Sequence, residues 1–105
     1  MSGILGQLAP GASAWNDLYT CPASTVATLR VIVSNRSSSA TTFRVAASEN
    51  GDAIDNKHWL APDKDINGND TGATIGFVIS SGDIVRVFAG SANLSFTATG
   101  ETRAE

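Results

Sequence analysis

A run of oxygen-bearing side chains from Asp63 to Asp70 comes nearest to a known chemistry. Asp63, Asp65 and Asn67 stand at alternate positions, a glycine follows at the sixth, and Asp70 stands at the eighth. The first six positions match the first half of a calcium loop, because a hard cation takes oxygen ligands and the glycine permits a sharp turn. The twelfth position is Thr74, where such a loop needs a bidentate glutamate. We therefore expect an Asx-rich turn without a metal, and calcium at these four residues is the alternative.

Side chains for nucleophilic catalysis are scarce. A serine or cysteine nucleophile needs a neighbouring base that a third group orients, and His58 is the only histidine. The only cysteine, Cys21, precedes Pro22 at a predicted strand end, where a small buried thiol is expected. His58 precedes Trp59 in a long predicted loop, where we expect a surface imidazole. The sequence therefore predicts neither an enzyme nor a cofactor.

Two segments are candidates for contacts with other proteins. The first runs from Ile4 to Asn16 and the second is the long irregular stretch from Ser48 to Gly72. Terminal arms and long loops can reach a neighbouring protein without disturbing a folded core. Aromatic residues there suit a protein or sugar surface, although a core role is equally common for them. The candidate contact residues are Ile4, Leu5, Leu8, Trp15, His58 and Trp59.

Composition and charge exclude several classes of partner. Seven Lys and Arg stand against ten Asp and Glu, and the basic residues are scattered along the chain. Nucleic-acid and membrane-surface binding both call for a concentrated basic face, so neither is expected. The N-terminus carries no basic leader with a long apolar run, which predicts synthesis in the cytoplasm. The single cysteine cannot form an intrachain disulfide, so packing must stabilise the fold.

Apolar residues recur at every second position, which is the period of a half-buried β-strand. The clearest run extends from Thr25 to Asn35, and the next, after a polar loop, from Thr41 to Ala47. We expect these two runs to form a hairpin. Further strands are predicted at 4–9, 17–21, 58–61, 73–79, 83–89 and 93–99, with Gly100 ending the last one. The predicted inward residues include Ile75, and the predicted core comprises Leu29, Val31, Phe43, Phe77, Val87 and Phe96.

This pattern predicts an all-β protein. About seven or eight short antiparallel strands separated by Gly, Ser and Asn turns are typical of one β-sandwich with jelly-roll or immunoglobulin-like connections. A length of 105 residues suits a single domain spanning 1–105. Within it, residues 1–14 are expected to form an N-terminal arm and residues 101–105 a polar tail.

An ordered set of short motifs continues across nearly the whole chain. It comprises Gly6-Gln7, Leu18-Tyr19-Thr20-x-Pro22-Ala23, Ala27-Thr28-Leu29, Thr42-Phe43-Arg44-Val45-Ala46, Trp59-Leu60-Ala61-Pro62-Asp63, Ile66-Asn67-Gly68-Asn69-Asp70-Thr71, Gly82-Asp83-Ile84-Val85-Arg86-Val87 and Asn93-Leu94-Ser95-Phe96. In this order the motifs resemble small β domains of tailed-phage structural proteins. Pro62 stands where the pattern has a β residue, and because proline cannot donate to a strand ladder it argues against strand pairing there.

The resemblance implies a virion component made in the host cytoplasm. A short single domain of this kind looks like a capsid cement or decoration protein that stabilises the phage head. The implied partners are the major capsid protein and copies of itself, as a homo-oligomer such as a trimer. The alternative is a tail, neck or adhesion module that binds protein or carbohydrate, since fold does not decide function.

Overall fold

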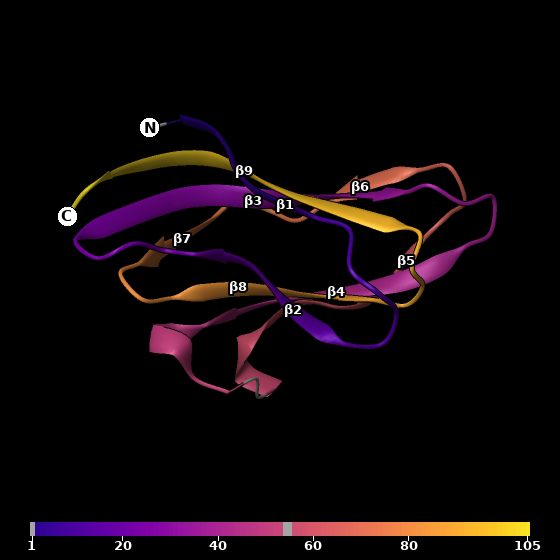
Figure 1. Cartoon of the computed structure of the whole chain (residues 1–105), viewed down its shortest axis with the longest axis horizontal. Helices are drawn as coiled ribbons and strands as arrows, with labels where there is room; N and C mark the ends of the chain where they lie inside the picture. The colour runs from indigo at the N-terminus through magenta and orange to yellow at the C-terminus, as the bar shows by residue number, and fades with distance from the viewer. Residues whose placement is uncertain (1, 54–55) are drawn as a thin grey trace.

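The computed structural model describes residues 2–53 and 56–105, and strands dominate it (Figure 1). No helix in these two ranges is long and apolar enough to cross a membrane. The elements in chain order are β1 (Ser2–Leu8), β2 (Trp15–Thr20), β3 (Thr25–Asn35), β4 (Thr41–Ser48), the short 3₁₀ helices η1 (Glu49–Gly51) and η2 (Asn56–His58), β5 (Trp59–Ile66), β6 (Thr71–Ala73), β7 (Phe77–Ser80), β8 (Ile84–Ala89) and β9 (Leu94–Ala104).

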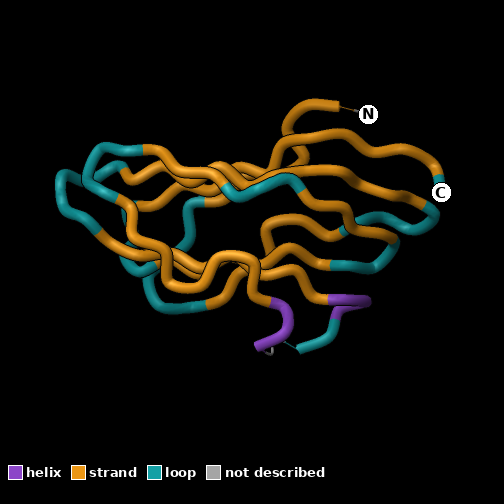
Figure 2. The backbone as a smooth tube through the Cα atoms, turned by 180° about the vertical axis from the view of Figure 1, so that it is seen from behind, coloured by secondary structure: helices purple, strands orange, loops and turns teal. Residues whose placement is uncertain are grey.

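The strands form two antiparallel sheets that face each other in a β-sandwich-like arrangement (Figures 1 and 2). Sheet A has the order β1-β9-β3-β6, and β7 pairs with β3 on the same edge as β6. Sheet B has the order β2-β8-β4-β5. The predicted all-β class with antiparallel strands is confirmed.

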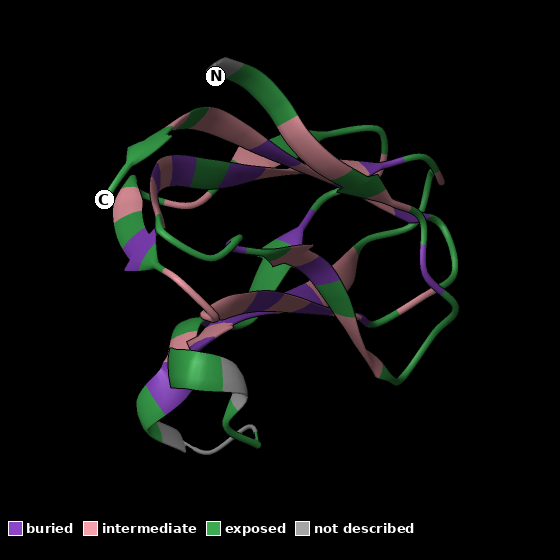
Figure 3. Cartoon of the chain, turned by 60° about the vertical axis from the view of Figure 1, so that its left-hand side comes forward, coloured by how far each residue is buried: buried purple, intermediate pink, exposed green. Residues whose placement is uncertain are grey.

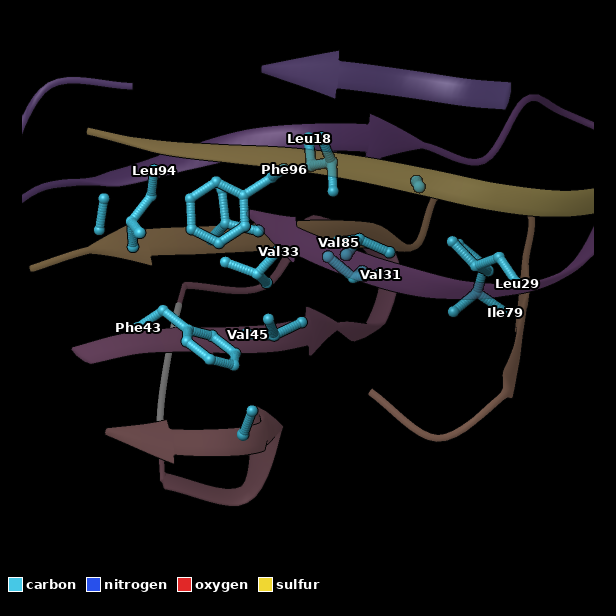
Figure 4. Close-up of a cluster of buried hydrophobic side chains, with 14 of the residues drawn as sticks. Leu18, Leu29, Val31, Val33, Phe43, Val45, Ile79, Val85, Leu94 and Phe96 are labelled. Carbon is cyan, nitrogen blue, oxygen red and sulfur yellow. The ribbon is translucent and has the colours of Figure 1, made fainter. Parts of the chain in front are cut away.

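The facing sides of the two sheets enclose one hydrophobic core (Figure 4). Burial alternates along the strands, so the inner face of each sheet is apolar and its outer face is exposed (Figure 3). The rings of Phe43 on β4 and Phe96 on β9 join the sheets edge to face, with centroids 6.5 Å apart. Of the six predicted core residues only Phe77 is partly exposed, because β7 lies at a sheet edge.

The predicted hairpin between Thr25 and Ala47 is wrong. β3 lies in sheet A and β4 in sheet B, so the chain crosses the sandwich between them. The buried side chain of Asn35 holds this crossing, because its Nδ2 donates to the carbonyl oxygens of Ser39 at 2.8 Å and Asn67 at 3.2 Å. The first bond closes the β3–β4 connection itself, and the second ties the end of β3 to the connection between β5 and β6. The polar loop therefore serves as a corner between sheets.

The predicted strand over 73–79 is broken in the middle. Thr74 takes both backbone bonds that Val31 offers at this edge, since its N–H donates to the Val31 carbonyl and its Oγ1 accepts from the Val31 N–H. The chain then leaves the ladder before β7 begins at Phe77. Ile75, predicted to point inward, is 85% exposed as a result.

The two ends of the chain are strands, which corrects the predicted arm and tail. β9 does not stop at Gly100 but pairs with β3 through Ala104, so 101–104 belong to sheet A. A Cβ on Gly100 would overlap the Thr28 carbonyl oxygen, so this glycine permits close strand approach rather than a turn. Within 1–14, residues Ser2–Leu8 form β1, which pairs with β9.

β5 lies at the edge of sheet B and contains the predicted edge strand near His58 to Ala61. Pairing with β4 continues across Pro62, although proline argued against it, and is irregular there. Phe43 pairs with Lys64 and Val45 with Ala61, so Pro62 and its neighbour stand opposite a single residue of β4. This is a β-bulge, which accommodates the missing proline donor.

Phe96→Ala should lower the free energy of unfolding by about 3–5 kcal/mol, because it empties a fully buried ring site. Phe77→Ala is the matched control and should cost clearly less, since that ring is already partly exposed. Urea unfolding of the two variants measures both values. Equal losses, or a larger loss at Phe77, would contradict the assignment of the core.

Candidate functional site

The outer face of sheet B carries a cluster of aromatic rings around one arginine. Trp15 pairs with Phe88 across β2 and β8, and Phe88 pairs with Arg44 on β4, so the three side chains share a face. Trp15 packs edge to face against Phe88 and Trp59, with centroids 5.6 and 5.7 Å apart. The Arg44 guanidinium lies 4.1 Å from the Phe88 centroid and 5.0 Å from that of Trp59. We call these four residues the aromatic cluster.

Charged groups on the same face are paired within the chain. Arg44 Nε donates to Asp63 Oδ1 at 2.6 Å, and Arg86 Nε donates to Asp17 Oδ1 at 3.0 Å. Arg86 Nη1 also donates to the carbonyl oxygen of Asp52 at 3.0 Å. These bonds tie the segment after β4 to the outside of the sheet. Most charged and aromatic side chains on the outer face of sheet B therefore have partners within the same chain.

The outer face of sheet A carries more of the large exposed apolar side chains than sheet B, where Leu60 on β5 is 43% exposed. Ile4 on β1 is 58% exposed and Val78 on β7 is 62% exposed, at opposite edges of the sheet, and Ile75 lies in the break before β7. Between them a shallow groove of about 330 Å³ is lined by Thr28, Leu29, Arg30, Gly76, Thr99 and Gly100. No ion pair or side-chain hydrogen bond is found for Arg30 within the described ranges. This face therefore offers both apolar surface and an uncompensated charge.

The six predicted contact residues are not brought together. Trp15 and Trp59 meet in the aromatic cluster, whereas Ile4 lies on the outer face of sheet A. Leu5 and Leu8 pack against the core from β1. The remaining residue, His58, was expected on the surface and is only 5% exposed. That expectation is wrong because η2 is packed against β4 rather than extended as a loop.

Cys21 is buried at the start of the connection from β2 to β3. Burial raises the pKa of the Cys21 thiol, and the nearby carboxylates of Asp83 and Glu105 raise it further. A thiol with a raised pKa stays protonated at neutral pH and is a poor nucleophile. Its Sγ lies 3.4 Å from the Thr25 carbonyl oxygen, to which it donates. The arrangement suits a structural role for Cys21.

The calcium candidates Asp63, Asp65, Asn67 and Asp70 extend from β5 into the following turn. Asp63 is engaged by Arg44, and Asp70 Oδ1 accepts from the Thr71 N–H at 2.8 Å. Among the residues that the structure describes, no three His, Cys, Asp or Glu side chains are grouped to hold a metal ion. An ion pair therefore accounts for Asp63 and local turn bonding for Asp70.

Sequence reasoning missed Arg30, Val78, Arg44 and Phe88. The signal for Arg30 was present, because it falls on the polar phase of a clearly alternating strand. The exposure of Val78 could not be predicted, because a period-two pattern does not show the break before β7. The packing of Arg44 on Phe88 joins residues far apart in sequence, and only strand order brings them together.

No family model, curated protein or solved structure matches the chain.

Removal of divalent metal should leave the fold unchanged. EDTA is expected to cause no shift in the melting temperature, because Asp63 already has a cationic partner in Arg44. Thermal unfolding with EDTA or with added calcium measures this. An increase in melting temperature with calcium that Asp65→Ala abolishes would establish the calcium alternative.

Proposed function

We propose that this protein is a non-enzymatic virion structural protein, a capsid cement or decoration protein that stabilises a phage head. The observation that carries a role in assembly is the outer face of sheet A, where Ile4, Val78 and Arg30 are exposed. Exposed apolar side chains grouped on one face are typical of interaction surfaces. The resemblance of the motif set to phage structural domains supports the capsid as partner.

We propose further that the chain has jelly-roll connectivity. Support comes from the strand order, β1-β9-β3-β6 in one sheet and β2-β8-β4-β5 in the other. If β6 and β7 count as one interrupted strand, each sheet has four strands and the chain passes repeatedly from one to the other. Jelly rolls of eight strands recur in viral capsid proteins. The connectivity is therefore consistent with a virion component, although fold alone does not assign function.

Copies of the protein act together in this proposal. A standard interface covers about 800 Å² of each partner, and one small domain has room for few such contacts. Linked copies that bind several capsid subunits gain affinity through effective concentration. The partners are therefore the major capsid protein and further copies of this chain, and the protein resides in the virion.

A second candidate function rests on the aromatic cluster. Trp15, Trp59 and Phe88 gather on one outer face, and aromatic faces are common in sugar-binding surfaces. A tail, neck or adhesion module that binds carbohydrate would use them. The edge-to-face packing and the covering Arg44 occupy these rings, which makes the cluster the weaker surface of the two.

Purified protein should bind phage heads assembled without it and raise the temperature at which they rupture. Cosedimentation measures the binding, and cryo-EM of complete particles with and without the protein locates it. The expected difference is regularly repeated density over the whole shell. Trp15→Ala is the matched control, because it alters the aromatic cluster and leaves sheet A unchanged.

Density confined to the tail or neck would overturn the cement function and favour the second candidate. Loss of binding in Trp15→Ala, together with competition by a soluble sugar, would point to carbohydrate recognition.

A further inference from the structure

We propose that a second copy of this chain docks on the outer face of sheet A, about a two-fold axis that runs from Ile4 to Val78. The inference rests on the self-association that the proposed function calls for. To that self-association it adds the surface through which two copies meet, their two-fold symmetry and the residues that pair between them.

Register places two rows of side chains across sheet A. Directly paired residues of antiparallel strands point to the same face, and each row is joined by such pairs. One row consists of Ile4, Thr99 and Arg30. The other, two residues further along the strands, consists of Glu101, Thr28 and Val78. The groove lies between the two rows.

The four end residues of these rows form a parallelogram. Ile4 and Val78 occupy its distant corners, while Arg30 and Glu101 are diagonal neighbours about 7–8 Å apart at its centre. A two-fold axis along the long diagonal exchanges the positions of Arg30 and Glu101. Each arginine then faces the glutamate of the other copy, and Ile4 and Val78 each meet their own counterpart. An isologous contact requires such self-complementarity.

Both charges are free to make these pairs. Arg30 and Glu101 are exposed, and in the described part of the chain neither makes an ion pair or a side-chain hydrogen bond. By contrast, Arg44 and Arg86 on sheet B are each bound to a carboxylate. An acidic partner would satisfy only Arg30 and a basic partner only Glu101. A second copy satisfies both charges, which is the reason for choosing it as the occupant.

The face is large enough for a specific dimer. Figure 1 looks along the shortest axis of the molecule and shows the sheets as stacked layers, so each outer face spans about the longest and shortest extents, 42 and 20 Å. A standard interface covers about 800 Å² per partner. The area defined by these two extents is close to the area that a standard interface covers on each partner.

Charge exchange tests the proposal in solution, with the molar mass measured by sedimentation equilibrium. The wild-type chain should reach twice its 10.8 kDa mass with rising concentration. Arg30→Glu and Glu101→Arg should each raise the dimer dissociation constant by about a hundredfold, roughly tenfold for each of two symmetry-related pairs. The double variant Arg30→Glu/Glu101→Arg restores both pairs and should dimerise like the wild type.

Lys64→Glu is the matched control, since it makes the same change of charge on sheet B and should leave the dimer intact. A monomeric wild type, a trimer that charge reversal leaves unchanged, or a double variant as weak as the single ones would overturn the proposal. Capsid binding is measured separately. A monomer that binds heads refutes this inference alone, whereas a charge-dependent dimer that binds no heads refutes the proposed function alone.

Discussion

The pairing of β3 with β9 is the constraint on which the rest of the structure depends. The two strands pair without interruption over eleven residues each, from Thr25 with Ala104 to Asn35 with Leu94. This ladder joins the first third of the chain to its last residues. It places Val31, Val33 and Phe96 on the inner face, and every other strand of sheet A pairs with one of these two. Once this register is set, both the core and the outer surface of the sheet follow from it.

The two outer faces differ in how many of their charged and aromatic side chains have partners within the chain. On sheet B, Arg44 is bound to Asp63 and stacked on Phe88, and Trp15 packs on Trp59. On sheet A, the two rows of outward side chains that cross β3 and β9 carry exposed Ile4 and Val78, and within residues 2–53 and 56–105 no ion pair is found for Arg30 or Glu101. Surface of that kind gains most from association, because burial removes apolar area from water and the pairing of charges sets the register between partners. For this reason we assign binding to sheet A.

The sequence predicts the strands well and their connections poorly. Period-two alternation located Thr25 to Asn35 and its inward residues correctly, since that pattern is local. The crossing after Asn35 depends on hydrogen bonds to residues about thirty positions away, which no local pattern contains. The sequence predicts a strand end at Gly100, because a glycine that permits close strand approach cannot be told from a turn glycine by sequence alone. Of the candidate site, Ile4, Trp15 and Trp59 could be predicted from the sequence. The groove around Arg30 could not, because it depends on the register between strands.

Amide hydrogen exchange of the native protein tests the central pairing most directly. If β3 and β9 form the ladder described here, the amides that face across it should be the slowest to exchange, and protection should continue beyond Gly100 at Glu101 and Arg103. Deep burial and complete backbone pairing slow exchange toward the rate set by global unfolding. Rapid exchange from residue 101 onward, with protection ending at Gly100, would contradict the account, because the register that defines both faces of sheet A would then be incomplete.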